Sequence, residues 1–245
     1  MNRKAQKTPP LCLAALMAAA LTASAELSLA DWDKGLSVGL NLADGNSDTV
    51  NLNAGLHAEK GTVEDEQRCA AGVDYNYGET GTQETVDNLQ AFIRHSRDIS
   101  GNTYGYGGVS YLRDDIALVD YRVTVGVGLG QYLIRDATTG LVVEFGVDEI
   151  FDDVGGITDE AFALRFAENL EHELSDTARI WQSVEFLPEA SDFDNYLLNL
   201  EIGAEADMND RLSLNVVVQD RYDSTPAVGR KSNDVTVLAG LGYKL

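Results

Sequence analysis

The chain has 245 residues, 44% of them hydrophobic, and a formal net charge of −22 at pH 7. So acidic a chain repels the phosphates of nucleic acids, which excludes nucleic acid as a partner. No stretch after residue 25 approaches the roughly 18 consecutive apolar residues of a membrane-spanning helix.

The first 25 residues predict an export signal. They open with three basic residues, continue with an apolar run over 11–21 and end at the small residues 23–25. The apolar run is too short for an N-terminal membrane anchor, so we expect cleavage and a single mature domain over 26–245. Cys69 would then be the one cysteine left, which rules out an internal disulfide.

Beyond the signal, apolar and polar residues alternate in twelve segments joined by turn residues. The clearest runs from Tyr121 to Leu133, with valines and leucines on one face and Arg122, Thr124 and three glycines on the other. Such segments exceed the ~5–6 residues of an ordinary globular strand and suit a strand that crosses a membrane at a tilt. We predict strands at 35–43, 48–59, 64–77, 85–99, 104–112, 121–135, 141–151, 160–171, 178–187, 195–206, 212–222 and 234–245.

Twelve such strands predict an all-β fold, a transmembrane antiparallel up-and-down β-barrel with apolar faces toward lipid and polar faces toward the lumen. Such barrels belong in the outer membrane of Gram-negative bacteria. The even strand number places both chain ends on the periplasmic side, so the connection 223–233 should lie outside the cell. The alternative is a periplasmic β-sandwich or lipocalin-like barrel, whose apolar faces would point inward.

Aromatic residues gather near the predicted strand ends, which is typical of the two interfacial belts of a lipid-spanning barrel. The predicted outer belt contains Tyr75, Tyr77, Tyr121, Phe151, Phe162, Tyr196 and Tyr222. The predicted inner belt contains Tyr104, Tyr106, Tyr132, Trp181 and Tyr243. Cys69 shares a face with Ala71 and Val73, so we expect a lipid-facing thiol with no reactive role.

The predicted inward faces carry charges of both signs. The acids are Glu64, Glu66, Asp74, Glu144, Asp148, Glu185, Glu201, Glu205 and Asp234. The bases are Arg68, Arg94, Arg122, Arg165, Arg179, Arg221 and Lys244. Because buried charge is tolerated only when partnered, we expect ladders of arginine–carboxylate pairs, with Arg122 and Glu144 as one candidate. The inward glycines Gly126, Gly128 and Gly130 should permit bending or bulky neighbours.

The sequence offers little for catalysis. Its histidines are His57, His95 and His172, and His95 stands beside Ser96 on a strand, where adjacent side chains point to opposite faces. A hydroxyl and an imidazole placed in that way cannot form a nucleophile–base dyad. We therefore predict no catalytic residues, no cofactor and no enzymatic activity; an outer-membrane hydrolase is the enzyme-class alternative.

Acidic groups also gather near the predicted outer rim, at Asp114-Asp115, Asp148-Glu149 and Asp152-Asp153. Carboxylates of this kind attract Ca²⁺ or Mg²⁺, but no calcium-binding loop motif accompanies them. We therefore predict no metal site, only a solvated acidic rim that binds divalent cations weakly.

Several short motifs resemble one family. They are Gly45-Asn46-Ser47, Asp120-Tyr121-Arg122 followed by Gly126-x-Gly128-x-Gly130, the aliphatic strand with Glu144 and Gly146, Leu212-Ser213-Leu214, Tyr222, Gly229-Arg230-Lys231, Asp234 and Gly240-Leu241-Gly242-Tyr243. With them the chain resembles the domain-of-unknown-function 481 family of salt-induced outer-membrane proteins. It departs at Asn233-Asp234, where the family has Thr-Asp, and at Leu245, where the family ends in an aromatic residue. The resemblance implies an outer-membrane barrel linked to salt stress and adds no catalytic residues.

The leading hypothesis is therefore a porin-like outer-membrane barrel with a structural or envelope-stress role and a lumen closed by its own paired charges. A small cation-preferring diffusion channel is the main alternative. The expected partners are outer-membrane lipid and lipopolysaccharide, the barrel-assembly machinery that handles the last strand, and divalent cations at the acidic outer loops.

Overall fold

The computed structural model describes residues 32–43, 49–62 and 65–245, and the predicted signal peptide, residues 1–25, lies outside them. Within the described residues, no helix has the length and apolar character needed to cross a membrane. Residues 33–245 form one unit built from strands.

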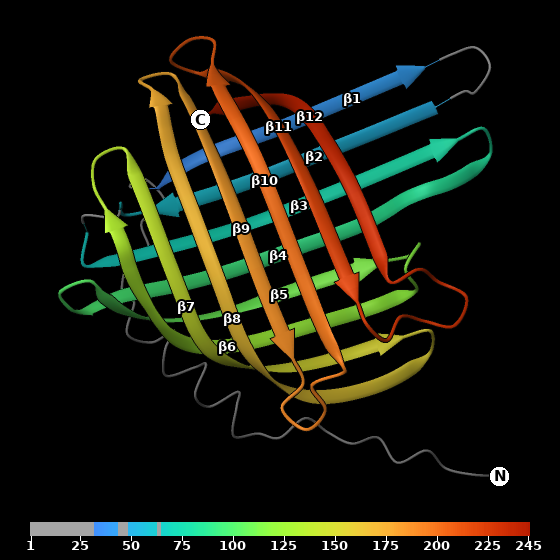
Figure 1. Cartoon of the computed structure of the whole chain (residues 1–245). Coiled ribbons are helices and arrows are strands. Elements are labelled where there is room, and N and C mark those ends of the chain that lie inside the picture. Colours follow the sequence, from blue (N-terminus) through green and yellow to red (C-terminus); the bar gives the residue numbers. More distant parts are fainter. Residues whose placement is uncertain (1–31, 44–48, 63–64) are drawn as a thin grey trace. The chain divides into compact units, whose positions relative to one another are not determined.

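The described chain contains twelve strands (Figure 1). Each predicted range overlaps one of them, and several strands extend beyond the predicted ends. The strands are β1 (Asp33–Ala43), β2 (Thr49–Lys60), β3 (Gln67–Thr80), β4 (Gln83–Ser100), β5 (Thr103–Asp114), β6 (Val119–Arg135), β7 (Thr139–Val154), β8 (Ile157–Ser175), β9 (Ala178–Pro188), β10 (Tyr196–Asp207), β11 (Leu212–Asp223) and β12 (Asn233–Lys244).

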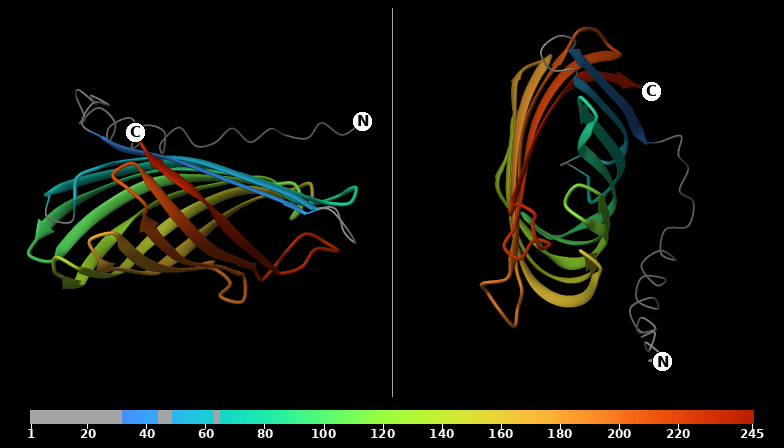
Figure 2. Two further views of the ribbon diagram at one scale, coloured as in Figure 1. Left: turned by 90° about the horizontal axis from the view of Figure 1, so that it is seen from above. Right: turned by 90° about the vertical axis from the view of Figure 1, so that its right-hand side faces the viewer.

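Each strand pairs antiparallel with its neighbours in sequence, and β12 returns to pair with β1, which closes a barrel. At this seam Gly35 lies opposite Lys244 and Val38 opposite Leu241, so β1 begins where β12 ends. Figure 2 shows the closed wall, which is oval when viewed toward one end. Four residue pairs close the seam between β1 and β12, and the up-and-down order confirms the predicted barrel topology.

Burial in the barrel is inverted relative to a water-soluble protein. On β6, Val127 and Leu129 are 58% and 55% exposed on the outer wall. Charged residues such as Asp148 and Arg165 are buried inside instead. Large exposed apolar side chains also lie on the outer wall of the other strands except β5. An apolar wall around a polar interior is the arrangement expected when the barrel's solvent is lipid, and it argues against the periplasmic alternative.

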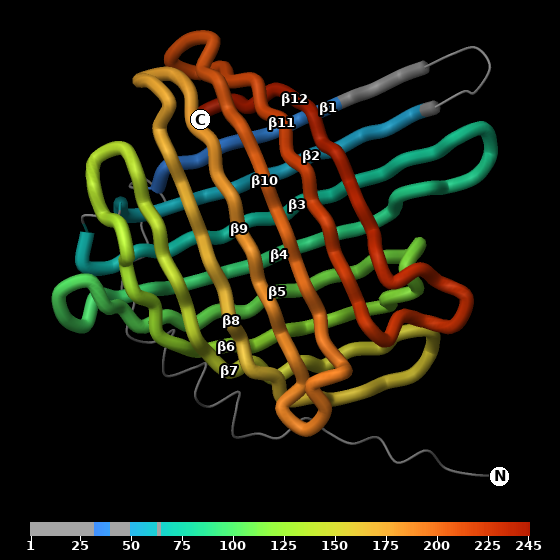
Figure 3. The backbone as a smooth tube through the Cα atoms, in the orientation of Figure 1, coloured from blue at the N-terminus to red at the C-terminus, as the bar shows by residue number. Residues whose placement is uncertain are grey.

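Two hairpins are tighter than the sequence suggests. β3 joins β4 through Gly81-Thr82, and β7 joins β8 through Gly155-Gly156. The three glycines have φ values of 65°, 62° and 79°, which side chains with a Cβ adopt rarely. Most of the predicted loops 78–84 and 152–159 is therefore strand. The longest connection among the described residues is 224–232, between β11 and β12, at the end away from the C-terminus (Figure 3).

The predicted inner aromatic belt is wrong. Tyr104, Tyr106 and Tyr132 are 5%, 8% and 5% exposed and cluster inside the barrel. Trp181 also points inward, where its indole Nε1 donates a 2.7 Å hydrogen bond to a carboxylate of the lumen. An interfacial belt needs side chains on the outer wall, and of the five predicted residues Tyr243 alone is exposed there.

The outer wall carries its own series of rings across β7 to β11, which we call the aromatic ladder. Ring centroids are 5.2 Å apart between Phe145 and Phe166, and 6.3 Å apart between Phe166 and Phe186. Tyr196 continues the ladder 5.4 Å from Phe186 and stacks on Tyr222 at 5.5 Å. The last two belong to the predicted outer belt, and they lie on adjacent strands near the same end of the barrel.

Candidate functional site

The barrel encloses a cavity of about 1150 Å³. Its lining runs from Lys34 and Lys244, where β1 begins and β12 ends, to Asp114 and Asp223 at the opposite end. Amide and hydroxyl side chains are frequent in this lining, including those of Ser37, Asn53, Gln90, Ser183, Asn199, Asn215 and Gln219. Charged and amide side chains therefore lie along the lumen from one end to the other, among apolar ones such as Phe92, Leu187 and Val217.

Glycines on the inward face of β6 make room for large side chains from the neighbouring strands. A Cβ atom on Gly130 would lie 2.2 Å from the Tyr104 ring, and one on Gly128 would lie 2.5 Å from the Tyr106 hydroxyl. The third glycine of the series faces the Asp148 carboxylate in the same way, at 2.2 Å. The prediction that these glycines accommodate bulky neighbours is confirmed.

Glu144 on β7 is the centre of a network of charged and polar side chains on one side of the lumen. It accepts hydrogen bonds from Arg94 on β4 and Tyr104 on β5, and its Oε2 accepts one from Arg165 Nη1 at 2.7 Å. Arg165 Nε also donates to Glu185 Oε1 on β9 at 2.6 Å. Breaking one member of so buried a network would leave an uncompensated charge. The network therefore fixes one side of the lumen in a single arrangement.

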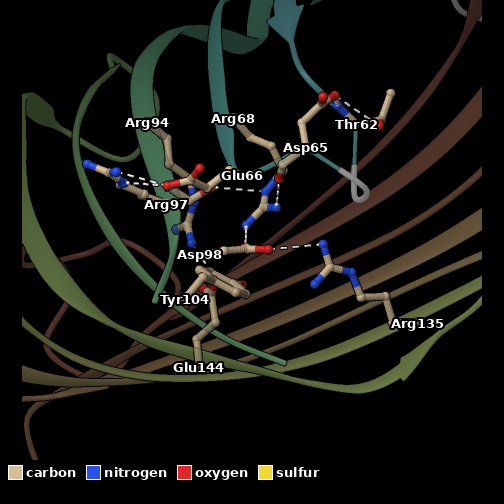
Figure 4. A network of polar contacts seen from close by, with 11 residues as sticks. Thr62, Asp65, Glu66, Arg68, Arg94, Arg97, Asp98, Tyr104, Arg135 and Glu144 are labelled. Atoms are coloured by element: carbon tan, nitrogen blue, oxygen red, sulfur yellow. Dashed lines mark hydrogen bonds and ion pairs between the residues drawn. The ribbon is translucent and has the colours of Figure 1, made fainter. Parts of the chain in front are cut away.

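A second charged cluster centres on Asp98 near the end of β4 (Figure 4). Its two carboxylate oxygens accept hydrogen bonds from Arg68 Nη2 at 2.8 Å and Arg135 Nη2 at 3.1 Å. Strict alternation along β6 would point Arg135 outward. The pairing of β6 with β7 shifts between Tyr132 and Ile134, and such a bulge reverses the facing of the residues beyond it. Sequence reasoning missed Arg135 for this reason, whereas alternation along β4 places Asp98 on the same face as Arg94 and could have identified it.

The turn before β3 departs from prediction. Glu66 was expected to face the lumen, but it pairs with Arg97 at 2.9 Å, and both side chains are more than half exposed. Glu64 lies outside the described residues. In the same turn the Thr62 backbone N–H donates to Asp65 Oδ2 at 2.7 Å, and this hydrogen bond holds the pKa of the Asp65 carboxyl below its usual value (Figure 4).

Arg122 forms buried ion pairs, but with two aspartates and not with the predicted Glu144. Its Nε donates to Asp152 Oδ2 at 2.8 Å and its Nη2 donates to Asp223 Oδ2 at 3.0 Å. The register of β6 and β7 places Asp152 opposite Arg122, whereas Glu144 lies opposite Gly130, well along the strand. The pairing of Arg122 with Glu144 is therefore wrong, although the expectation of paired charges holds.

The remaining predicted inward bases are paired as well. They form the ion pairs Arg179–Glu205 at 3.3 Å, Arg221–Asp114 at 3.5 Å and Lys244–Asp207 at 2.8 Å. Acids are in excess, however. Among the described residues that line the cavity, eleven are acidic and seven basic, an excess of four negative charges. Asp148 is 4% exposed, its Oδ1 has no hydrogen-bond partner, and it forms no ion pair with an arginine of the described chain within 4 Å.

The three histidines lie apart. His57 Nε2 lies 2.9 Å from Asp74 Oδ1 in the lumen, and His95 Nδ1 lies 3.1 Å from Cys69 Sγ on the outer wall. His172 Nδ1 lies 2.9 Å from the hydroxyl of a threonine on β7, but in the described chain no carboxylate hydrogen-bonds to that imidazole. A nucleophile, a base and an orienting group do not converge at any of the three.

The acidic rim is dispersed in the same manner. Asp152 and Asp114 each hold an arginine, and Glu149 lies on the opposite face of its strand from Asp148. Within the described ranges, no three histidine, cysteine or acidic side chains lie close enough together to hold one metal ion.

The solved structures that match this chain include porins and the translocator domain of an autotransporter. The NanC porin matches with a TM-score of 0.53 and 8% identity, over 87% of this chain and 100% of that one. The translocator domain of the autotransporter NalP from Neisseria meningitidis gives 0.49 and 15%, over 96% and 97%. The KdgM porin gives 0.46 and 9%, over 87% and 99%. At these identities the likeness to the NanC porin shows a shared fold.

Comparison with curated proteins gives no match. The family model described as "Protein of unknown function, DUF481" matches residues 36–245, which is almost all of the barrel. The match covers the residues on which the resemblance in the sequence rests, from the glycine series of β6 to the final strand. The chain therefore belongs to the DUF481 family of proteins of unknown function.

Proposed function

We propose that this protein is an integral outer-membrane barrel whose lumen is a narrow, polar passage that prefers small cations. The observation that carries the proposal is the cavity of about 1150 Å³, along which charged and amide side chains recur from one end of the barrel to the other. Its acidic excess supports the preference for cations, because fixed negative charge attracts them and repels anions.

The apolar outer wall supports the membrane location. Val127 and Leu129 are representative of a surface that would be costly to expose to water, whereas lipid tails solvate it without cost. The partners expected from the sequence, outer-membrane lipid, lipopolysaccharide and the barrel-assembly machinery, follow from this location. No catalytic step is part of the proposal.

The network around Glu144 occupies one side of the lumen, so the passage runs beside it. The opposite half is formed by β1 to β3 and β9 to β12, where the lining side chains are mostly amides, hydroxyls and carboxylates. Such groups replace part of an ion's hydration shell and let it pass. Because the arginine ladders occupy much of the interior, we expect small ions to pass and large solutes to be excluded.

The test is single-channel recording in a planar lipid bilayer under a KCl gradient. We expect discrete conductance steps and a reversal potential that reports a preference for K⁺ over Cl⁻. Asp148→Asn removes a lumenal carboxylate whose Oδ1 has no hydrogen-bond partner, so it should shift the reversal potential toward that of a non-selective pore.

The matched control is Asp176→Asn, which makes the same change of charge in the exposed turn between β8 and β9, outside the cavity lining. We expect this variant to conduct like the wild type. Insertion of the barrel without conductance steps would contradict the passage and favour a structural barrel closed by its own ion pairs. A preference for Cl⁻ would contradict the role of the acidic excess.

A further inference from the structure

A polar pair lies on the outer wall of the barrel, between β8 and β9. Glu168 shares the outward face of β8 with Phe166, since Ala167 between them is buried inside. Gln182 lies on the outward face of β9, next to the inward-pointing Trp181. The Gln182 side-chain Nε2 donates a hydrogen bond to Glu168 Oε2 at 3.0 Å. The two residues therefore form one polar unit across adjacent strands.

Apolar side chains surround this pair on every side. In the register of the sheet, Glu168 lies between Val143 and Val184, and Gln182 lies between Leu170 and Ile202. The next outward residues on the two strands are Phe166 and Ile180. Apolar residues thus enclose the pair, and the outward acids Glu149 and Glu160 lie further along β7 and β8.

The pair is incompletely satisfied by its own hydrogen bond. Gln182 has two amide hydrogens and Glu168 has two carboxylate oxygens, and the bond uses one of each. A carboxylate exposed to hydrocarbon is costly unless further donors reach it. The second N–H of Gln182 and the second oxygen of Glu168 are complementary to each other, so a copy of the same pair supplies what each lacks.

The aromatic ladder lies directly beside the pair. Phe145 and Phe166 are 54% and 42% exposed on the same wall, with ring centroids 5.2 Å apart. Aromatic rings offer large, rigid contact area and are enriched at the centres of protein interfaces. The β8–β9 wall thus combines a packable apolar surface with one self-complementary polar contact.

We propose that two copies of the barrel associate in the membrane through their β8–β9 walls, with the Glu168–Gln182 pairs facing each other across a twofold axis. In an isologous interface of this kind, Gln182 of one copy donates to Glu168 of the other, and the reverse contact follows from symmetry. The inference rests on the proposed membrane location, because the wall meets hydrocarbon only there.

Disulfide trapping in proteoliposomes tests the contact. In a Cys69→Ser background, Val184→Cys places a thiol on the proposed interface beside Glu168, and oxidation should produce a dimer of twice the monomer mass. The control is Leu56→Cys on β2, five strands from β9 around the barrel, where the side chain is 51% exposed. We expect that variant to stay monomeric under the same oxidation.

A second variant separates the polar contact from simple proximity. Glu168→Leu combined with Gln182→Leu keeps the wall apolar and removes the proposed hydrogen bonds between the two copies. We expect this double change to lower the trapped dimer fraction about three- to tenfold, the effect of losing one or two hydrogen bonds in a membrane. Insertion, read by protection from added protease, should be unchanged.

The outcomes are distinguishable. Inserted, conducting barrels that give no dimer with Val184→Cys would overturn this inference and leave the proposed function intact. Equal trapping at both cysteine positions would overturn it too, since that result reports random collision. Failure of the wild type to insert would overturn the proposed function, and the inference with it.

Discussion

Three inward glycines of β6 decide where the large side chains of the lumen can lie. Tyr104 and Tyr106 pack over Gly130 and Gly128 more closely than a Cβ atom would allow, and their hydroxyls then reach Glu144 and Arg165. Absence of a side chain on one strand thus creates the space for a charged network on its neighbours.

Gly128→Ala should therefore destabilise the barrel by about 1–3 kcal/mol, the usual effect of overpacking. The added Cβ would lie 2.5 Å from both the Tyr106 hydroxyl and the Phe145 carbonyl oxygen, and a backbone atom cannot move aside easily. Gly140→Ala on β7 is the control, because nothing lies within 4 Å of its Cβ position. Urea unfolding of the two variants from liposomes measures the difference, and equal midpoints would argue against the packing described.

The ion pairs of Arg122 give a second prediction at the residue scale. Arg122→Ala leaves Asp152 and Asp223 without their cation, so it should destabilise the barrel by about 3–5 kcal/mol. Adding Asp152→Asn removes one of the orphaned charges, so the double variant should lose less than the sum of the singles, with a coupling of about 0.5–3 kcal/mol.

A second double-mutant cycle, which serves as the control, combines Arg122→Ala with Glu144→Gln. These residues do not touch, and Glu144 already pairs with Arg94 and Arg165, so the two effects should add to within about 0.5 kcal/mol. Unfolding free energies from denaturant titration serve for both cycles. Coupling with Glu144 in place of Asp152 would mean that the register of β6 and β7 differs from the one described.

The alternation in the sequence predicts most of the residues that face the lumen, with Glu66 and Arg135 as exceptions, but not how they pair. All seven predicted inward bases have carboxylate partners. Partner identity depends on register, which hairpin lengths and bulges set, and this is why Arg122 was matched with the wrong acid and Arg135 was missed. Tyr132 shows another limit of the sequence. Alternation along β6 places its side chain in the lumen, whereas its position near a strand end suggested the interfacial aromatic belt, and the structure shows it buried inside.

At the scale of elements, strand existence and order follow from the sequence, whereas strand ends do not. Long strict alternation identified each strand. Polar residues at the outer ends of β7 and β8 suggested a loop, yet Asp152 and Asp159 pair within the sheet because these strands extend beyond the apolar wall. Hydrophobic patterning stops where the lipid contact stops, and backbone hydrogen bonding continues further.

The connection 224–232 gives a prediction at this scale. It contains Arg230 and Lys231 and joins β11 to β12 at the end opposite to that where β12 finishes. If β1 begins on the periplasmic side, this loop lies outside the cell. Trypsin added to intact cells should then cut after Arg230 or Lys231, while Arg211, between β10 and β11, stays protected until the outer membrane is opened. Cleavage in the reverse order would mean an inverted barrel.

At the scale of the whole molecule, the central feature is the inversion of polarity across one closed sheet. The acidic excess of the chain is consistent with a soluble protein, and the overall hydrophobic fraction of 44% hides the pattern, because only every second residue of a strand meets the outer wall. The fold follows from that alternation together with the even number of strands. The width and continuity of the lumen depend on side-chain packing, which the sequence alone does not predict.

The measurement that tests this account most directly is the environment of side chains on the two faces of β6. Val127→Cys and Thr124→Cys, each in a Cys69→Ser background, carry a nitroxide label on the outer wall and in the lumen, respectively. In liposomes the label at 127 should collide with lipid-soluble oxygen and be shielded from a water-soluble nickel chelate, and the label at 124 should show the reverse. Labels with equal accessibility, or with the two preferences exchanged, would contradict a barrel whose apolar wall faces lipid.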